Sequence, residues 1–445
     1  MSSIQNTEEN TMEQKEKEKK KKIYKELKFD RLDNTAQLFP VIASESMTSV
    51  YRISVTLKEE INPGFLQEAL AIVLPYFDVF HARLRQGVFW YYFETNGKEA
   101  PLVTEETTYP CRFISPYNNK NYLFRVTYYR NRINLEVFHV LTDGMGAVTF
   151  LKELTYQYLR LAHPELALAT GEGLCSETSL NREDSYQKNY KKTEAKGYKT
   201  EKAYKIKGPC LEVNTLGVIH GYVNIPTLKN AAKARGVSIN TFLVGIYMYS
   251  IYKECLHGQI SRKPITICVP VNLRPFFESI TTRNFFTVVQ AYFKPEKEEY
   301  TFEEILDLVN SSLKDQITRE NLERLISYGV ANERKLVIRA VPLFIKNLVI
   351  RMVYKSSAAA NTTTLTNVGN VEIAEAYQPY VERFHTILSM TEGQNIKGSI
   401  ISYQDSLAIT FSTGLKDMAI QRTFFRKLSK EGVPVTIESN GVYYE

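Results

Sequence analysis

One segment in the first half of the chain, residues 133–161, does most to limit the possible folds. Residues 133–138 alternate apolar with polar side chains, which is typical of a strand with one buried face, and His139 continues the apolar face at the end of that strand. A turn containing Asp143 and two glycines follows, and apolar residues then recur at helical spacing over 150–161. The chain is therefore predicted to contain a strand, a tight turn and a helix in succession, with a histidine at their junction.

The same two patterns recur along the rest of the chain. Alternating strand-like and helix-like segments indicate an α/β fold. At 445 residues the chain is long enough for two sizeable lobes or for one large α/β body. The predicted strands lie at 49–57, 89–93, 122–138 (a hairpin), 217–225, 265–271, 285–293, 399–402 and 407–412, and the predicted helices begin after Asn62-Pro63 and at Pro226 and cover 240–254 (capped by Asn240), 302–317 and 418–428.

Changes in composition divide the chain into four parts. Residues 1–28 are rich in Lys and Glu and too poor in apolar residues to offset the entropy of ordering, so we predict a disordered charged tail. Residues 182–207 carry many lysines interleaved with tyrosines and few aliphatic residues. Such a tract could contact RNA or a phosphate-bearing ligand, but we interpret it as a solvated linker between an N-terminal lobe, 29–181, and a C-terminal lobe, 208–445.

Charge and cysteine content exclude several classes of protein. A net charge of +7, from 56 basic and 49 acidic residues, suits anionic small molecules better than a dedicated nucleic-acid surface. The five cysteines are widely spaced without a CxxC pair, and the other histidines lack ligand spacing, so no disulfide framework or metal site is predicted. The N-terminal basic run is not followed by an apolar region, and no uninterrupted apolar stretch of about 18 residues occurs. We therefore predict a cytoplasmic protein without a transmembrane segment.

His139 begins the segment HVLTDG, residues 139–144. A lone histidine at the end of a strand is most often a buried structural residue, and glycines often only ease a turn. Here Asp and Gly stand together at the fourth and fifth positions after the histidine, which six histidines would rarely produce by accident in a chain poor in both. The segment resembles the HxxxDG signature of the chloramphenicol-acetyltransferase-like superfamily of CoA-dependent acyltransferases.

Three further segments are similar to stretches of this superfamily and follow in the expected order: PVNLRP at 270–275, RNFF at 283–286 and TNVG at 366–369. The resemblance spans about residues 32–440. It implies an α+β sandwich of two lobes with mixed sheets, meeting at a tunnel that acyl donor and acceptor enter from opposite faces. It also implies that Asp143 and Gly144 are structural, with Asp143 pairing with Arg274 of the other lobe through a charge-assisted bond.

The chemistry that the resemblance implies suits a histidine. A neutral imidazole, with an ordinary pKa near ~6.5, can take a proton from an acceptor hydroxyl or amine as that atom attacks a thioester. His139 is therefore predicted to be the general base of a direct transfer without an acyl-enzyme. Asn284 and the Thr287 hydroxyl are candidates for binding the oxyanion or the substrate. The implied co-substrate is an acyl-CoA, such as acetyl-CoA, and no permanently bound cofactor is expected.

Departures from the family pattern narrow the prediction. Phe138 stands where condensation domains and wax-ester synthases usually carry a second histidine, and the plant-type DFGWG motif is absent. The chain resembles most the bacterial alcohol acetyltransferases, which implies transfer to the hydroxyl of a small or lipid-like alcohol. Two alternatives stay open: condensation with a carrier protein as partner, and a catalytically idle homologue that binds a partner. The intact His139 and Gly144 weigh against the idle homologue.

The stretch 336–354 mixes aliphatic residues with Arg339, Lys346 and Arg351, as a basic amphipathic helix does. Such a helix could rest on a membrane or admit a lipid. We favour a helix that covers the tunnel or the core, because basic side chains on a buried helix commonly extend their charged ends to water.

Overall fold

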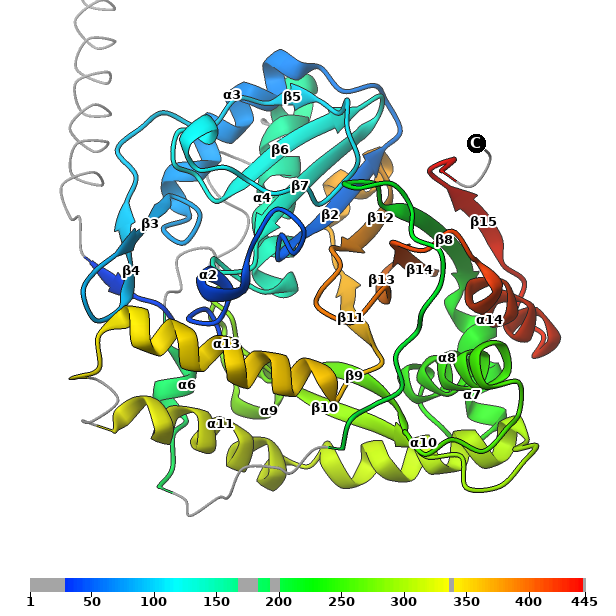
Figure 1. Cartoon of the computed structure of the whole chain (residues 1–445). Helices are drawn as coiled ribbons and strands as arrows, with labels where there is room; N and C mark the ends of the chain where they lie inside the picture. The colour runs from blue at the N-terminus through cyan, green and yellow to red at the C-terminus, as the bar shows by residue number, and fades with distance from the viewer. Residues whose placement is uncertain (1–28, 167–182, 193–200, 336–339, 443–445) are drawn as a thin grey trace, which may run out of the picture.

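The computed structural model describes residues 29–166, 183–192, 201–335 and 340–442. The tail predicted for residues 1–28 lies outside the described residues, as does the middle of the Lys/Tyr-rich segment. The described chain forms two lobes that lie against each other, each built on a sheet (Figure 1). The predicted α/β class is confirmed, and several pairs of strands are parallel within otherwise antiparallel sheets.

The sheet of the N-terminal lobe has five strands, and two helices cover it. All eight residues of its strand β2 are buried, because helices pack on one face and the other lobe closes the second. The helices are α3 (Pro63–Val73) and α4 (Gly144–Ala162). The strand order is β12 (Val381–Leu388), β2 (Val50–Leu57), β7 (Arg132–Phe138), β6 (Phe124–Tyr129) and β5 (Thr104–Glu105).

The sheet of the C-terminal lobe has seven strands and its own apolar core. The order is β10 (Phe286–Phe293), β9 (Ile265–Asn272), β11 (Thr363–Val371), β13 (Ile396–Tyr403), β14 (Ser406–Thr413), β8 (Gly217–Asn224) and β15 (Thr436–Ser439). The helices that pack with it are α7 (Ile225–Ala234), α8 (Ile239–Leu256), α10 (Phe302–Gln316) and α14 (Ala419–Lys430).

Strand β12 ties the two lobes together. Its neighbours along the chain, β11 and β13, lie in the seven-stranded sheet, whereas β12 pairs antiparallel with β2 in the five-stranded sheet. Residues 381–388 therefore complete the N-terminal sheet although they come from the second half of the chain. The division into 29–181 and 208–445 did not anticipate this exchange, because strand pairing across the chain leaves no local pattern.

Helix caps explain where two of the helices begin. The Asn62 side chain accepts hydrogen bonds from the backbone of Gly64 and Phe65, so α3 starts at the predicted cap. The cap of helix α8 lies two residues earlier than predicted, at Ser238 and not at Asn240. The Ser238 hydroxyl accepts a hydrogen bond from the Thr241 amide at 3.1 Å. Ser238 has the extended backbone that a cap requires, whereas Asn240 is already inside the first helical turn.

The described parts of the Lys/Tyr-rich segment are packed, which corrects the expectation of a solvated linker. Tyr186, in the short helix α6 (Ser185–Lys188), is buried and exchanges hydrogen bonds with the backbone of Phe286. Further along, Ala203 and Ile206 are buried as well. One side of the segment packs on the C-terminal lobe. Lys205 also turns inward and donates to the Ala358 and Asn361 carbonyls, whereas the other described lysines are exposed.

A third, smaller group of elements lies along one edge of the molecule (Figure 1). It comprises β1 (Asp30–Arg31), β4 (Tyr91–Thr95) and β3 (Ala82–Gln86) in one sheet, with the helices α2 (Phe39–Ile42), α9 (Arg274–Phe277), α11 (Arg319–Arg334) and α13 (Leu343–Ala359) nearby. Single 3₁₀ turns cover Leu74–Tyr76, Tyr117–Asn119 and Glu375–Tyr380.

Helix α13 corresponds to the predicted basic amphipathic helix, although it begins only after Pro342 and residues 336–339 lie outside the described part. One side packs inward, and Arg351 donates a hydrogen bond to the Val41 carbonyl of α2 at 3.0 Å. The opposite side is exposed. The expectation of a helix that simply covers the protein interior is therefore incomplete. No helix in the described part of the chain has the length and apolar character needed to cross a bilayer.

Candidate active site

The junction of β7 and α4 carries the motif histidine. The backbone amide of His139 donates to the Ser49 carbonyl at 3.0 Å, which holds the end of β7 against the start of β2. Asp143 is the N-cap of α4 and accepts a hydrogen bond from the Gly146 amide. A Cβ on Gly146 would lie about 2.2 Å from the Thr282 carbonyl oxygen, so this position needs glycine, whereas a Cβ on Gly144 would meet Val368 at 3.4 Å. The motif turn is thus shaped by contacts from the other lobe.

Aromatic rings surround the imidazole of His139. The Phe39 ring of α2 stacks on it with centroids 4.4 Å apart, and the Tyr51 and Phe286 rings lie at 4.9 and 5.6 Å. This burial lowers the pKa of His139 below its ordinary value of 6.5, although a hydrogen bond to the backbone of His139 itself and the carboxylate of Asp143 oppose the shift. The imidazole is therefore neutral at physiological pH, which is the form that accepts a proton.

Asn284 fixes which nitrogen of His139 carries the hydrogen. The Asn284 carbonyl oxygen lies 3.1 Å from His139 Nδ1, so Nδ1 donates and Nε2 keeps its lone pair. Nε2 forms no hydrogen bond to any of the described residues. His139 and Asn284 come from different lobes, since His139 follows β7 of the N-terminal lobe and Asn284 lies just before β10 of the C-terminal lobe. The arrangement leaves the lone pair of Nε2 without a hydrogen-bond donor among the described residues.

Asp33 fixes the orientation of Asn284 in turn. The Asn284 amide nitrogen donates to Asp33 Oδ2 at 3.2 Å and to the His139 carbonyl at 3.3 Å. Asp33 is buried, and burial raises its pKa to about 6. Since both amide hydrogens of Asn284 are engaged, the structure favours a positioning role for this residue over the predicted role in binding an oxyanion. Asp33 was not predicted, because no spacing relates it to the motif.

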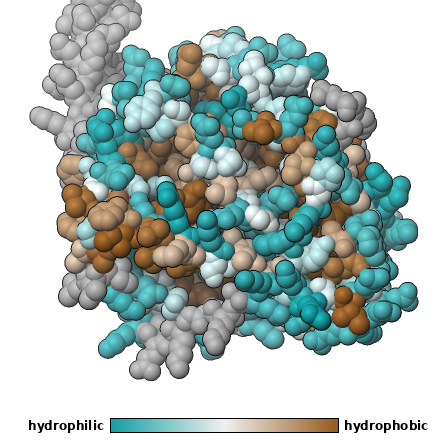
Figure 2. Space-filling view, in the orientation of Figure 1, coloured by the Kyte–Doolittle hydropathy of each residue, from teal (hydrophilic) through white to brown (hydrophobic). Residues whose placement is uncertain are grey.

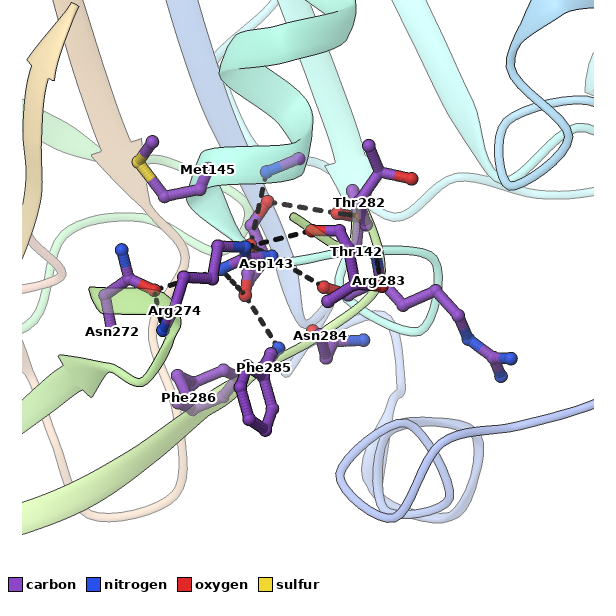
Figure 3. A network of polar contacts seen from close by, with 12 residues as sticks. Thr142, Asp143, Met145, Asn272, Arg274, Thr282, Arg283, Asn284, Phe285 and Phe286 are labelled. Carbon is purple, nitrogen blue, oxygen red and sulfur yellow. Dashed lines mark hydrogen bonds and ion pairs between the residues drawn. The ribbon is translucent and has the colours of Figure 1, made fainter. Parts of the chain in front are cut away.

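Asp143 is held by donors from the C-terminal lobe (Figure 3). Arg274 places two nitrogens on the two carboxylate oxygens of Asp143, at 2.9 and 3.0 Å, and the Phe285 amide donates to Oδ2 at 2.8 Å. Arg274 also donates to the backbone carbonyls of Thr281 and Arg283. The pair is thus a bidentate contact between the start of α4 and the start of α9, as the resemblance implied, and it joins the lobes beside His139.

The structure does not bring the Thr287 side chain to His139. Strand β10 alternates, and its odd-numbered residues Val289 and Ala291 are buried in the core of the C-terminal lobe. Thr287 shares that side, whereas its neighbour Phe286 lies on the side that faces the imidazole. The prediction of Thr287 as an oxyanion donor is corrected by this alternation, because the sequence showed the strand but not which face meets the other lobe.

Lys397 of β13 is a buried cation that sequence inspection missed. It lies on the same side of its strand as Ser399, whose hydroxyl donates to the Thr386 carbonyl of β12, so both face the N-terminal lobe. Burial lowers the pKa of Lys397 to about 8, and its charge contributes to the lowered pKa of His139. Lys397 and His139 are thus electrostatically coupled across the lobe interface. In the sequence it is one lysine among many.

Two cavities lie beside the segment that carries Phe39. One, of about 480 Å³, is lined by Leu32, Asn34 and Gln37 together with α13, and another, of about 300 Å³, is lined by Pro40 and Ala43 together with β3. Neither is lined by His139 itself, so the imidazole sits behind this segment. No group of three or more His, Cys, Asp or Glu side chains in the described ranges is arranged to hold a metal ion.

Comparison with known proteins identifies the fold. No protein-family model matches the sequence, and no characterised protein is similar enough in sequence to be detected. The structure of the chain, in contrast, is similar to several solved structures. The chain is similar to F. sporotrichioides TRI101 complexed with coenzyme A and T-2, at a TM-score of 0.64 and 11% identity over 92% of this chain and 99% of that one.

Two other solved structures share the arrangement. Polyketide synthase associated protein 5 from Mycobacterium tuberculosis matches with a TM-score of 0.57 and 13% identity, over 89% of this chain and 96% of that one. The starter condensation domain of rhizomide synthetase RzmA matches with a TM-score of 0.56 and 12% identity, over 89% and 93%. The chain therefore adopts the two-lobed fold of the chloramphenicol-acetyltransferase-like, CoA-dependent acyltransferases.

Proposed function

We propose that the protein is an acyl-CoA-dependent O-acyltransferase that moves a short acyl group, such as acetyl, to the hydroxyl of a small or lipid-like alcohol, with His139 as the general base. The observation that carries this proposal is the state of the His139 imidazole. It is neutral, its Nδ1 is held by Asn284, and its Nε2 has no partner among the described residues. The expected cytoplasmic location suits acyl-CoA as the donor.

The reaction needs one proton acceptor that later becomes a donor. The acceptor hydroxyl would donate its hydrogen bond to His139 Nε2, and as the oxygen attacks the thioester carbonyl the proton would pass to Nε2. The tetrahedral intermediate then breaks the carbon–sulfur bond, and the leaving thiolate takes the proton from the imidazolium. The products are an ester and free coenzyme A, and His139 is neutral again.

Four other charged or polar side chains have parts in this proposal. Asp143 and Arg274 hold the motif turn between the lobes, and Gly146, where a Cβ would meet the Thr282 carbonyl oxygen, lets the first turn of α4 approach the other lobe, whereas a Cβ on Gly144 would make only an ordinary contact with Val368. Asn284 positions the base. Lys397 is buried at the lobe interface, and its charge adds positive potential at His139.

The comparisons support the proposal at the level of the fold. TRI101, whose structure was solved with coenzyme A and T-2, shares the lobes that meet at His139 in this chain. The likeness to a starter condensation domain favours a second candidate, in which a carrier protein presents the acyl or aminoacyl group. The two candidates differ in the donor and use the same base.

The test is release of free thiol from acetyl-CoA and longer acyl-CoAs in the presence of a panel of alcohols and amines. Wild type should release thiol only with an acceptor, and His139→Ala should lower the rate by about 10² or more. His163→Ala, at the end of α4, is the matched control and should keep the rate. Release that is unaffected by His139→Ala would remove this residue from the mechanism. No release with any CoA donor would favour the carrier-protein candidate or an idle homologue.

A further inference from the structure

The outer side of α13 is an exposed apolar surface. Its six large apolar side chains are between 42% and 73% exposed, and they form two adjacent rows at helical spacing. Folded proteins rarely expose so many neighbouring apolar side chains unless the surface binds something. The outer row consists of Phe344, Leu348 and Met352, and the second row consists of Ile345, Val349 and Val353, of which Val349 and Val353 also line the cavity of about 480 Å³.

The loop between β3 and β4 extends this surface. Val88, Phe89 and Trp90 at its tip are exposed, and the Val88 carbonyl accepts a hydrogen bond from the Leu343 amide at 2.8 Å. Lys346 Nζ donates to the Phe89 carbonyl at 2.8 Å. The loop tip and the start of α13 are therefore adjacent, and Figure 2 shows apolar residues gathered where the two lie. We call residues 88–90 and the two rows of α13 the apolar platform.

The charged side chains of α13 are all basic, and the acidic residue near the apolar platform is Glu333 of α11, on the inner side of the cavity of about 480 Å³ that Phe89, Trp90 and Val349 also line. The sequence of α13 contains no Asp or Glu, and by helical spacing Lys346 borders one apolar row while Arg351 borders the other. Lys355 follows in the next turn. The guanidinium of Arg31 lies 5.4 Å from the Trp90 ring centroid. An apolar strip edged by basic residues is complementary to a surface that is apolar inside and anionic at its rim.

We propose that the apolar platform docks the protein on an anionic lipid surface, with α13 lying flat at the level of the headgroups. In that position the apolar rows enter the boundary of the acyl chains and Lys355 reaches the phosphates, whereas Lys346 and Arg351, which donate to the Phe89 and Val41 carbonyls, add positive potential at the border. A tryptophan at the edge of the apolar region is also typical of this boundary. The proposal does not depend on the acyl-transfer proposal. A protein partner is less well matched, because opposite charges would be expected to alternate along its border.

Trp90 makes docking directly observable, since it is the only tryptophan in the chain. The full-length protein is titrated with vesicles of phosphatidylcholine and with vesicles that also contain phosphatidylglycerol. The anionic vesicles should shift Trp90 emission to shorter wavelength and carry the protein with them on sedimentation, and added salt should weaken both effects. No shift and no sedimentation with anionic vesicles would overturn the proposal.

The variant that tests the surface is Phe344→Ser/Leu348→Ser/Met352→Ser. These side chains are exposed, so the thermal unfolding midpoint should not change, and binding to anionic vesicles should weaken by about tenfold or more. The matched control replaces three exposed apolar residues elsewhere by serine and should bind like wild type. The control positions are Leu102, Val213 and Ile260.

Two outcomes would count against the apolar platform. The basic run at residues 15–22 is unchanged in every variant, so equal binding by wild type and the triple variant would assign vesicle binding elsewhere. A concentration-dependent dimer that the triple variant abolishes, without vesicle binding by wild type, would identify a second copy of the chain as the occupant.

Discussion

At the scale of single residues, the site depends on a chain of hydrogen bonds that runs from Asp33 through Asn284 to His139. Asp33 orients the amide of Asn284, and Asn284 presents its oxygen to Nδ1 of the imidazole. Phe39 keeps the ring in place by stacking. The neighbours of His139 therefore set its tautomer and its orientation while the imidazole stays neutral, which is the state that the proposed role as a base requires.

Replacing Asn284 with alanine should therefore lower kcat by about tenfold to a hundredfold, because the imidazole loses the acceptor that selects its tautomer. The hydrogen bond that His139 Nδ1 donates to the Asn284 oxygen raises the pKa of His139, so its loss should also move the acidic limb of the pH–rate profile to lower pH. In wild type that limb should already lie below pH 6.5, since burial lowers the pKa of His139 and activity disappears only when the base becomes protonated. Measuring kcat and kcat/KM against pH would show both effects. An unchanged profile would mean that Asn284 does not act through His139.

At the scale of elements, the contact between Asp143 and Arg274 joins α4 to α9. Both side chains are largely buried, and the carboxylate also caps α4 and accepts from the Phe285 amide. Asp143 thus caps a helix and joins the two lobes at the same time. Its loss would affect the local turn and the position of the second lobe together.

Asp143→Asn should lower the free energy of unfolding by about 3–5 kcal/mol, because Arg274 would keep a buried charge without its carboxylate. Thermal or denaturant unfolding measures this change, and thiol release should fall with it. The matched control is Glu303→Gln, which breaks the exposed pair with Arg235 and should cost within about 1 kcal/mol. An Asp143→Asn protein with wild-type stability would show that the pair does not hold the lobes.

The elements that the sequence predicted best are those whose pattern is local. The sequence of strand β2 alternates apolar with polar residues, although all of them are buried in the fold. Helix α3 has the predicted cap and first-turn proline, and α10 buries the residues that helical spacing selected. These predictions are confirmed. His139 at the end of its strand and the Asp143–Arg274 contact were also accessible, the first from alternation and the second from a resemblance.

What could not be predicted depends on contacts between distant parts of the chain. Asp33 and Lys397 reach the site only because the lobes fold together, and nothing in their immediate neighbourhood distinguishes them. The side of β10 on which Thr287 lies is likewise decided by the core beneath it. The roles of Asp33 and Lys397 and the pairing of β12 therefore required the three-dimensional arrangement, whereas the elements with a clear local pattern did not.

At the scale of the whole molecule, the lobes also meet at a pair of buried histidines. The rings of His220 on β8 and His385 on β12 lie 4.8 Å apart. His220 Nδ1 is 2.8 Å from the Thr410 hydroxyl, and His385 Nε2 is 2.8 Å from the Tyr222 hydroxyl. Burial, together with nearby positive charge, lowers the pKa of His220 to about 3 and that of His385 well below its ordinary value.

Low pH should therefore destabilise the folded protein through this pair of histidines. In the unfolded chain both histidines titrate near pH 6.5, whereas in the folded protein they stay neutral to much lower pH. Below about pH 6.5 the unfolded state binds protons that the folded state does not, so stability is fully present above that pH and decreases as pH falls. His385→Gln should make this decrease shallower in thermal unfolding, and His163→Gln on the surface should not. Equal slopes for wild type and His385→Gln would exclude the pair as a source of acid sensitivity.

The exchange of β12 between lobes has a consequence for anyone who wishes to divide this protein. A fragment that ends near residue 181 would leave β2 as an open edge with its backbone groups free to pair with other chains, and such edges promote aggregation. The remaining fragment would carry β12 without its sheet. One half lacks a strand of its sheet and the other carries that strand unpaired, so the two halves are not independent modules that could be expressed apart and recombined. The lobes are joined by a shared strand and not by a flexible hinge.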